Sequence, residues 1–473
     1  MEFVNTPCYN EKNEGGGNML AKRKVDATQG PLMSLIFTFA IPLILTTLVQ
    51  DLFNIADKAV LGNMAGSVAV AAIGATGSIT GLIINGAVGL ATGTTIVLAR
   101  YVGQKNDEKI RSTIDTSLIS SILLGIIVAA LGVIFAPAFL RATDCPEECF
   151  SGALLYMRIY IAGAPFTLFY NYGAAILRTL GDTQRPLFYI IVSGIVNVVL
   201  NVILCLILPE KVAAVAIATI TSKIISSVLV ARRLMRFEDS ARVVVKNMRF
   251  QWSAFTQIFR FGVPVSISNM VLPLANLQIV SAVNSYGVDA IAGNSAAGSV
   301  HTVVTAFSTG FGAATATFMG QNIGARNVDR VKKSFRYSFW INVLITGSLG
   351  LVMCLTGEFW LKLILGADEV AAINYGMIRM WLVTLFMFVH AANKCFTSGL
   401  QAFGYPFLTS VTNVVFTLGF RVLWMQVIYP HHPTFDMVML CFSVAWIINM
   451  LFYGGFFLAI YRRYVKKGIC KKI

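Results

Sequence analysis

The chain has 473 residues, of which 56% are hydrophobic and 12% are charged. Because soluble domains carry about 25% charged residues, this composition excludes an ordinary soluble protein and predicts an all-α integral membrane protein. The formal net charge is +15, but the basic residues lie between apolar segments, where the positive-inside rule places them. The charge therefore indicates membrane topology rather than a nucleic-acid partner.

The first 30 residues are polar, and we expect residues 1–30 to form a cytoplasmic tail. No short apolar core with a small-residue cleavage site precedes the first long apolar segment, so no cleaved signal peptide is expected. Met1 and Met19 both remain candidates for the true start of the chain.

Twelve apolar segments follow, each long enough to cross a bilayer core about 30 Å thick. We expect them at residues 34–61, 68–98, 113–140, 153–178, 187–208, 212–233, 255–283, 290–319, 334–356, 374–400, 407–429 and 437–461. Lysine and arginine are concentrated in alternate connecting segments, which predicts that both termini are cytoplasmic.

Cys145 and Cys149 share a loop on the side of the membrane opposite to the termini, where a disulfide is permitted. Their spacing alone does not establish that they form one.

The second half of the chain repeats the first. The stretch Phe37–Pro42 (FTFAIP) recurs as Phe259–Pro264 (FRFGVP), and each half contains six spans that begin on the same side. Parallel repeats of this kind are related by a pseudo-twofold axis along the membrane normal, with a cavity between the halves. The expected divisions are an N-lobe at 31–233, a basic cytoplasmic linker at 234–254, a C-lobe at 255–461 and a basic cytoplasmic tail at 462–473.

This organisation is typical of a secondary transporter. The sequence contains no P-loop, no HExxH motif and no GxSxG motif with triad candidates, so an enzyme and a nucleotide-driven pump are not expected. No cofactor is predicted, and no cysteine or histidine cluster has metal-ligand spacing. Active transport would therefore have to draw on an ion gradient.

An acidic side chain lies within the first apolar span. Gln50, Asn54 and Asp57 stand at i, i+4 and i+7, which places them on one face of a helix. A carboxylate inside the bilayer costs a few kcal/mol on insertion scales, so Asp57 is predicted to be functional. The alternative is a structural aspartate bonded to a neighbouring helix.

The fifth and sixth spans could complete a site around this carboxylate. Asn197 and Asn201 form a polar stripe on the fifth, and Thr219 and Lys223 lie on the sixth. We hypothesise that Asp57 alternates between pairing with Lys223 and binding a proton. For any single amide or hydroxyl, an interhelical hydrogen bond without a transport role is the alternative.

The spans of the second half contain no buried Asp or Glu but several cationic and polar residues. The residues predicted to line a substrate cavity are Gln50, Asn54, Lys223, Asn269, His390, Lys394 and Arg421. A cavity with this balance of charge does not obviously favour cationic substrates.

Five motifs carry a resemblance to a known family: FNIADKAVLGNMAG, RTLGDTQRP, NVVLN, GADEV and LQAFG. With these, residues 31–465 resemble the multidrug and toxic compound extrusion (MATE) family. The resemblance implies two six-helix bundles that form an outward-opening V, and efflux of drugs driven by proton or sodium antiport.

The resemblance also implies roles for single residues. Asp57 matches the acidic residue of the family's N-lobe cation site, Asn197 matches an asparagine of that site, and Thr219 matches a threonine of the sixth helix. Asn201 stands where many members carry aspartate. The missing charge favours proton coupling, with sodium bound at Asp57, Asn197 and Asn201 as the alternative.

These observations predict a monomeric antiporter of the plasma (inner) membrane whose partners are a small organic substrate and the lipid bilayer. Two alternatives stay open: a flippase or exporter for an anionic or lipid-linked metabolite, and a non-transporting membrane receptor.

Overall fold

A computed structural model describes residues 25–142, 147–237 and 241–467, and these ranges contain helices and no β-strand. Met19, Cys145 and the last residues of the basic tail lie outside the described residues, as does the side chain of Lys58. The expectations about the chain start and about a Cys145–Cys149 disulfide therefore stay predictions.

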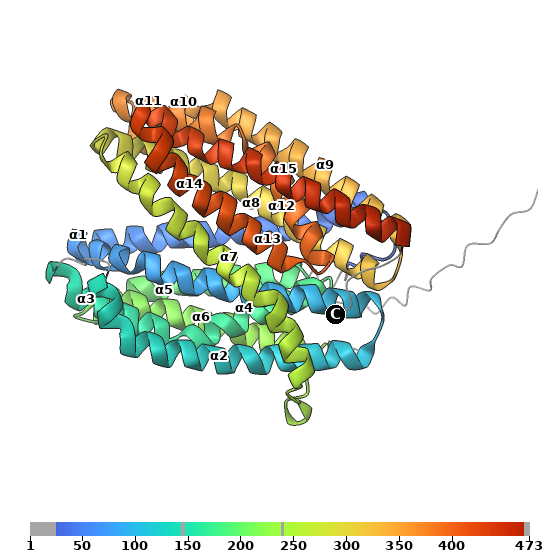
Figure 1. Cartoon of the computed structure of the whole chain (residues 1–473). Coiled ribbons are helices and arrows are strands. Elements are labelled where there is room, and N and C mark those ends of the chain that lie inside the picture. The colour runs from blue at the N-terminus through green and yellow to red at the C-terminus, as the bar shows by residue number, and fades with distance from the viewer. Residues whose placement is uncertain (1–24, 143–146, 238–240, 468–473) are drawn as a thin grey trace, which may run out of the picture.

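The first bundle consists of helices α1–α6 (Figure 1). Helix α1 (Leu32–Gly103) folds back on itself and contributes two spans, Leu32–Asp57 and Ile79–Gly103. The others are α2 (Asp107–Ala142), α3 (Glu147–Ala162), α4 (Ala164–Thr179), α5 (Gln184–Ile207) and α6 (Lys211–Met235). A short 3-10 turn, η2 (Val245–Asn247), lies in the connection to the second bundle.

The second bundle begins with α7 (Trp252–Asn284), α8 (Val288–Gly324) and α9 (Val328–Leu355). Its remaining elements are α10 (Gly357–Leu365), α11 (Val370–Arg379), η3 (Met380–Thr384), α12 (Met387–Ala402), α13 (Pro406–Asn413), η4 (Val414–Gly419), α14 (Phe420–Leu423), η5 (Trp424–Ile428), η6 (Tyr429–His431) and α15 (Phe435–Lys467). The segments η3, η4 and η5 are π-helical turns within longer helices.

Nine stretches of the described residues are long and apolar enough to cross a membrane, and the pair α3–α4, bent by 46°, makes a tenth. Helices α7 and α8, with 33 and 37 residues, are also long enough to cross. Together these stretches account for the predicted twelve spans, and the prediction of an all-α membrane fold is confirmed.

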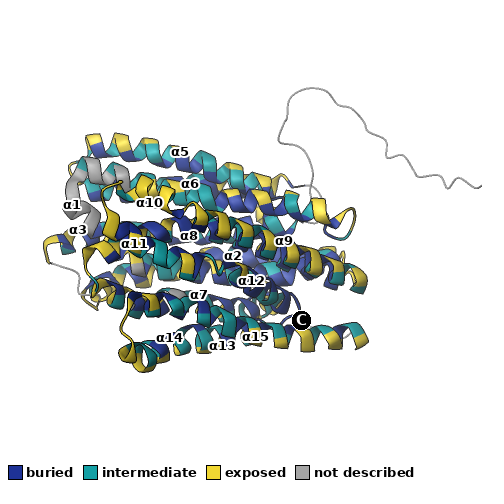
Figure 2. Ribbon diagram, turned by 90° about the horizontal axis from the view of Figure 1, so that it is seen from above, coloured by how far each residue is buried: buried dark blue, intermediate teal, exposed yellow. Residues whose placement is uncertain are grey.

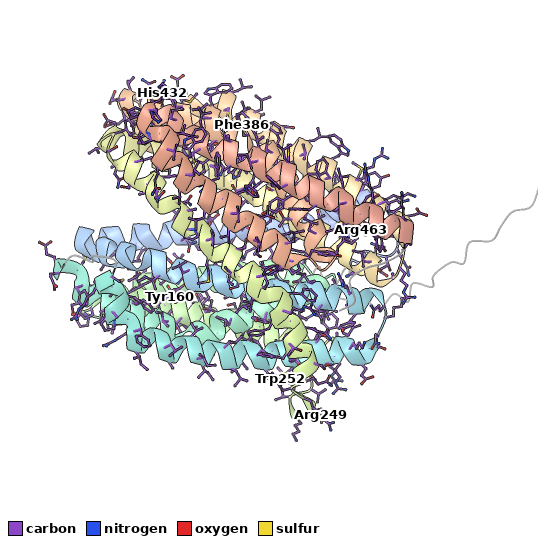
Figure 3. The ribbon with its side chains drawn as sticks, viewed as in Figure 1. Tyr160, Arg249, Trp252, Phe386, His432 and Arg463 are labelled. Atoms are coloured by element: carbon purple, nitrogen blue, oxygen red, sulfur yellow. The ribbon has the colours of Figure 1, made fainter. Side chains whose placement is uncertain are left out.

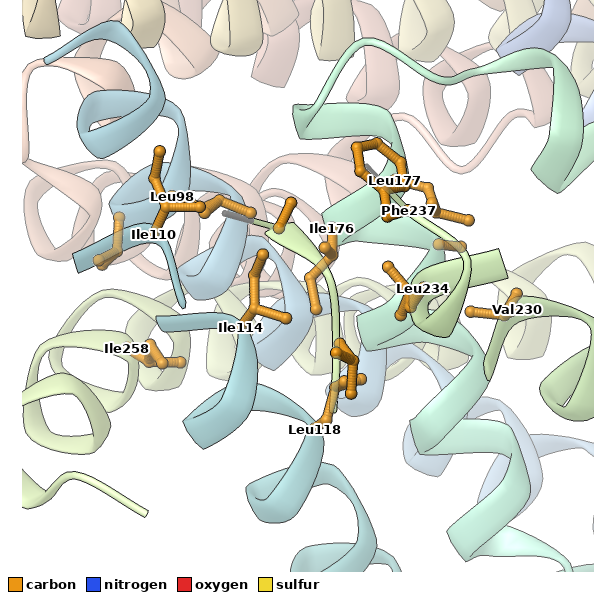
Figure 4. Close-up of a cluster of buried hydrophobic side chains, with 14 of the residues drawn as sticks. Leu98, Ile110, Ile114, Leu118, Ile176, Leu177, Val230, Leu234, Phe237 and Ile258 are labelled. Carbon is orange, nitrogen blue, oxygen red and sulfur yellow. The ribbon is translucent and has the colours of Figure 1, made fainter. Parts of the chain in front are cut away.

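Buried residues run along the inner helices of the molecule (Figure 2), and many of them are apolar. The largest cluster in the first bundle joins α1, α2, α4 and α6 through residues such as Leu98, Ile114, Ile176 and Leu234 (Figure 4). Exposed apolar residues, including Ile126 and Phe135 on α2, lie on the outer surface, where they can meet lipid.

The two bundles contact each other mainly through α1, which packs against α7 and α8. The backbones of α1 and α7 approach closely at Gly93, where a Cβ atom would lie only 2.3 Å from the carbonyl oxygen of Ile258. Small residues at such crossings let membrane helices pack tightly. This contact brings the inner faces of the two bundles toward each other.

The end of the molecule where α1 begins is closed by the segment from Val25 to Gly30, called here the N-terminal strap. The backbone N–H of Val25 donates to the carbonyl of Gly181 in the first bundle at 3.1 Å. On the other side, the side chain of Arg330 donates to the carbonyls of Ala27 (2.8 Å), Gln29 (2.6 Å) and Gly30 (3.0 Å). The strap therefore links the two bundles.

Direct hydrogen bonds between the bundles reinforce this closure. Gln321 on α8 donates to the carbonyl of Thr179 at 2.7 Å, and Arg100 on α1 donates to the carbonyl of Ala402 at 2.6 Å. Arg178 and Gln401, the immediate neighbours of these two carbonyls, line a cavity between the bundles. The closed end of the molecule thus forms the floor of that cavity.

Candidate functional site

A central cavity of about 470 Å³ lies between the two bundles. This volume is within the range of about 300–1,000 Å³ that is usual for small-molecule sites. Its walls come from both arms of α1, from α4, and from α7, α8, α12, α13, η4 and α15 of the second bundle. Both lobes therefore contribute to one site.

The charge of the cavity wall is positive. Arg178 and Lys394 are its charged lining residues, His390 lies beside them, and no aspartate or glutamate is among the described residues that line it. Neither cation forms a salt bridge with a carboxylate in the described part of the chain. An anionic group entering the cavity would therefore meet uncompensated positive charge.

The side chain of Lys394 fits against α8 because residue 312 of that helix is a glycine. A Cβ atom at Gly312 of α8 would lie 2.5 Å from Cγ of Lys394. Because Gly312 has no side chain, the aliphatic stem of Lys394 can lie against α8. The ammonium at the end of this stem then reaches the cavity.

An aromatic and imidazole cluster forms the wall next to this lysine. His390 lies 3.1 Å from the hydroxyl of Ser308 through its Nδ1 atom, and its ring centroid is 5.2 Å from that of Trp446. Trp446 also stacks on His301 at 5.9 Å. Trp446 and His390 both line the cavity, so an aromatic surface adjoins the cationic one.

A polar network lines another part of the cavity wall in the second lobe. Asn449 donates to the hydroxyl of Thr417 at 3.0 Å, Thr417 donates to Asn413 at 2.7 Å, and Asn413 donates to Ser268 at 2.7 Å. These neutral groups can adapt to different hydrogen-bonding partners because hydroxyls and amides both donate and accept.

A second polar cluster lies within the first lobe, outside the cavity lining. Asn201 donates from Nδ2 to Oδ1 of Asp57 at 2.6 Å, and more weakly to Oδ1 of Asn197 at 3.4 Å. Tyr160, which Figure 3 labels, lies next to this cluster and stacks on Tyr156 with the ring centroids 5.7 Å apart. The carboxylate and two amides of this cluster thus come from two helices, α1 and α5.

Close packing of α1 on α5 produces this contact. A Cβ atom at Gly194 would overlap the ring of Phe53, at 1.8 Å from Cε2. The missing side chain at Gly194 lets Phe53 sit against α5, and the stripe formed by Asn197 and Asn201 then faces α1.

The predicted site residues are divided between these two places. Gln50, Asn269, His390 and Lys394 line the central cavity. Asp57, Asn197 and Asn201 meet in the first-lobe cluster.

The other predicted residues lie elsewhere. Thr219 donates to the backbone of Val215 at 2.9 Å, and Lys223 is within electrostatic range of Asp57 without forming an ion pair. Asn54 is exposed, and Arg421 is buried and donates to Asn276 at 2.7 Å. The described cavity lining includes none of Asn54, Lys223 and Arg421.

Arg178 lines the cavity although the sequence did not predict it as a site residue. It lies at the end of α4 in the RTLGDTQRP motif, and a sequence alone suggests a cation in a cytoplasmic loop. The nearby carboxylate of Asp182 accepts from Arg185 at 2.5 Å and from Arg233 at 3.4 Å. Asp182 therefore forms its ion pairs with Arg185 and Arg233, and Arg178 is left to line the cavity.

Twelve spans in two bundles with a polar cavity between them define a multi-pass membrane transporter. The family model named MatE matches the chain twice, over residues 42–203 and 264–424, and the chain belongs to this family. Members of the family are transporters rather than enzymes.

Known proteins resemble the chain over most of its length. It is 25% identical to the probable multidrug resistance protein YoeA of Bacillus subtilis (strain 168) over 437 residues, which cover 90% of this chain and 93% of the relative. It is 24% identical to a protein named FAD transporter from Shewanella oneidensis over 315 residues, covering 65% and 69% of the two chains.

A solved structure of a MOP superfamily transporter from Pyrococcus furiosus has the same fold, with a TM-score of 0.84 at 22% identity over 93% of this chain and 99% of that one. Its description states that the reverse polarity of its binding pocket suggests a different function.

Proposed function

We propose that this transporter is a secondary antiporter that exports organic solutes carrying an anionic group. The observation that carries the proposal is the charge of the central cavity, where Arg178 and Lys394 face the solute space and no carboxylate is among the described lining residues. In a low-dielectric site, unpaired cations attract an anion much more strongly than they would in water. The same charges disfavour a cationic drug.

Relatives support both parts of this proposal. The multidrug resistance name of the Bacillus relative agrees with export of organic solutes. The Shewanella relative is named for FAD, an anionic and aromatic solute, and the Pyrococcus transporter is described as having a pocket of reversed polarity. In this chain, Trp446 and His390 place aromatic surface beside Lys394, which suits a solute with both an aromatic ring and an anionic group.

We propose proton coupling at Asp57. In the arrangement described, the amide NH₂ of Asn201 donates to the carboxylate, which is the hydrogen bond expected for a charged Asp57. A protonated Asp57 would carry its own donor, so Asn201 would have to turn its carbonyl oxygen toward it. The exchange between these two states alters the contact between α1 and α5.

Sodium coupling is the alternative at the same residues. A sodium ion would need the carbonyl oxygens of Asn197 and Asn201 directed at it together with Asp57. Asn201 contributes an uncharged amide, so Asp57 is the one carboxylate of this cluster, and the low negative charge favours proton coupling. No cofactor is needed in either scheme.

The protein would act in the plasma (inner) membrane as a monomer with both termini in the cytoplasm. The strap and the bonds from Arg100 and Gln321 would then close the cytoplasmic end. Rocking of the two lobes about the cavity would open that end and close the other, giving each side access in turn.

The experiment is uptake into inside-out vesicles, with FAD as the anionic probe and ethidium as the cationic one, under an imposed proton or sodium gradient. The proposal expects proton-driven accumulation of FAD and little of ethidium. Accumulation of ethidium alone would contradict anion selectivity, and a sodium requirement would contradict proton coupling. Binding of FAD without flux would support the receptor alternative, and flux of a lipid-linked anion only would support the flippase.

A further inference from the structure

The connection between the two lobes presents a basic and aromatic surface. Between Ala241 and Trp252, exposed cations alternate with exposed apolar residues, and Val245 and Trp252 are 66% and 68% exposed. This stretch contains no acidic residue. The surface, called here the linker surface, consists of Arg242, Val245, Lys246, Arg249, Phe250 and Trp252.

The linker surface is held firmly against the first lobe. The backbone N–H of Val243 donates to the carbonyl of Leu234 at 3.1 Å, and Val243 is buried in the same apolar cluster as Leu234. Gln251 accepts from the hydroxyl of Ser112 at 2.5 Å, and its backbone N–H donates to Thr116 at 3.1 Å. These bonds therefore fix where the linker surface lies on the first lobe and the side of the lobe from which its exposed side chains project.

That direction is sideways from the bundle. Figure 3 shows Arg249 and Trp252 at the lateral edge of the first lobe rather than past the ends of its helices. A surface in this position faces the surrounding membrane.

The depth of the linker surface corresponds to the lipid headgroup layer. The run of exposed apolar residues on α2 begins at Ile122, six residues after Thr116, which holds Gln251. Six helical residues span about 9 Å. Each headgroup layer is about 5–7.5 Å thick, because the two layers together extend the bilayer from about 30 Å to about 40–45 Å. Gln251 therefore lies near the outer edge of the headgroup layer, and the exposed side chains beside it are within reach of the lipid phosphates.

Aromatic side chains connect this surface to the core of the membrane. Trp252 stacks on Phe255 at 5.1 Å, and Phe255 stacks on Phe259 one turn further along α7 at 4.3 Å. Tryptophan is enriched at the membrane–water interface because its ring is apolar and its N–H is polar. This aromatic row therefore sets the position of the protein along the membrane normal, and with it the level at which the cations of the linker surface meet the headgroups.

We propose that Arg242, Lys246, Arg249 and Trp252 form a binding surface for anionic phospholipid headgroups. The cations contact the lipid phosphates and the indole ring lies among the upper acyl carbons. By the positive-inside rule, this surface belongs to the cytoplasmic leaflet. Basic clusters next to membrane spans bind anionic lipids in this way. The inference does not depend on which solute the cavity carries.

The test measures lipid quenching of Trp252. Brominated phosphatidylglycerol is titrated into the full-length protein in a neutral detergent, and the contribution of Trp252 among the six tryptophans is the difference between the wild type and Trp252→Phe. The triple variant Arg242→Gln, Lys246→Gln, Arg249→Gln should weaken the lipid affinity on the order of a hundred-fold. Its melting temperature should match that of the wild type, because all three side chains are exposed.

A matched control removes three other exposed cations at the same end of the second lobe: Arg326→Gln, Lys333→Gln, Arg336→Gln. This control should leave the quenching of Trp252 unchanged. Equal weakening by the control, or equal quenching by brominated phosphatidylcholine, would overturn the proposal. Competition by inorganic phosphate at the same concentration as the lipid would show a site for free phosphate and would also overturn it.

Discussion

A hydrogen bond of 2.6 Å from Asn201 on α5 to the carboxylate of Asp57 on α1 joins these two helices. One proton decides which of the two side chains must donate, because a carboxylate only accepts whereas a carboxylic acid also donates. A local change of charge is thereby converted into a change in how two helices meet. Lys223 has no ion pair with Asp57 in this state, so pairing between them stays a prediction for another step of the cycle.

Replacing Asp57 by asparagine tests this role. Asp57→Asn keeps the size of the side chain and removes its ability to exchange a proton. We expect proton-driven export to fall at least ten-fold, while equilibrium binding of the solute in the cavity is retained, because the cavity lining does not include Asp57. Vesicle flux and equilibrium binding measure the two effects separately. Export at the wild-type rate under the same gradient would be incompatible with coupling at this residue.

At the scale of elements, the N-terminal strap connects the lobes at one end of the cavity. It contacts Gly181 of the first lobe and Arg330 of the second, so it cannot keep both sets of contacts if the lobes separate there. The strap should therefore stabilise the state described here relative to one open at the predicted cytoplasmic end. Each lost hydrogen bond is worth about 1 kcal/mol.

Arg330→Ala removes the hydrogen bonds that this side chain makes to three strap carbonyls. We expect the population open at that end to rise on the order of ten-fold or more. Spin labels at the exposed positions Glu108 and Arg336, with accessible native cysteines replaced, would report the distance between the lobes. Lys333→Ala, an exposed change on the same helix, is the control. An unchanged distance distribution in Arg330→Ala would show that the strap does not hold the lobes together.

For the whole molecule, the sequence predicts the fold better than the site. Apolar length and the internal repeat are enough to predict twelve spans, because a helix must satisfy its backbone within the membrane. They do not reveal that the predicted span at residues 153–178 is two helices, α3 and α4, that meet at a 46° bend.

The site is harder to predict, because residues on the same face of a helix can differ in where they lie along the helix relative to the cavity. Gln50 and Asn54 share a predicted face, yet Gln50 lines the cavity and Asn54, one turn further on, is exposed. Conversely, Arg178 is placed at the cavity by the packing of α4, although its sequence neighbours suggest a loop. Contacts between distant helices decide both outcomes.

The positive charge of the cavity is expected to select the solute, and equilibrium binding of FAD and ethidium to the purified wild type and to Lys394→Met tests this selection. Methionine keeps the apolar stem that packs against Gly312 and removes the charge. Because a hydrogen bond to a charged group is worth about 1.5–3 kcal/mol, we expect FAD binding to weaken about 10–100-fold and ethidium binding not to weaken. Unchanged FAD affinity, together with tighter binding of ethidium than of FAD by the wild type, would contradict this expectation.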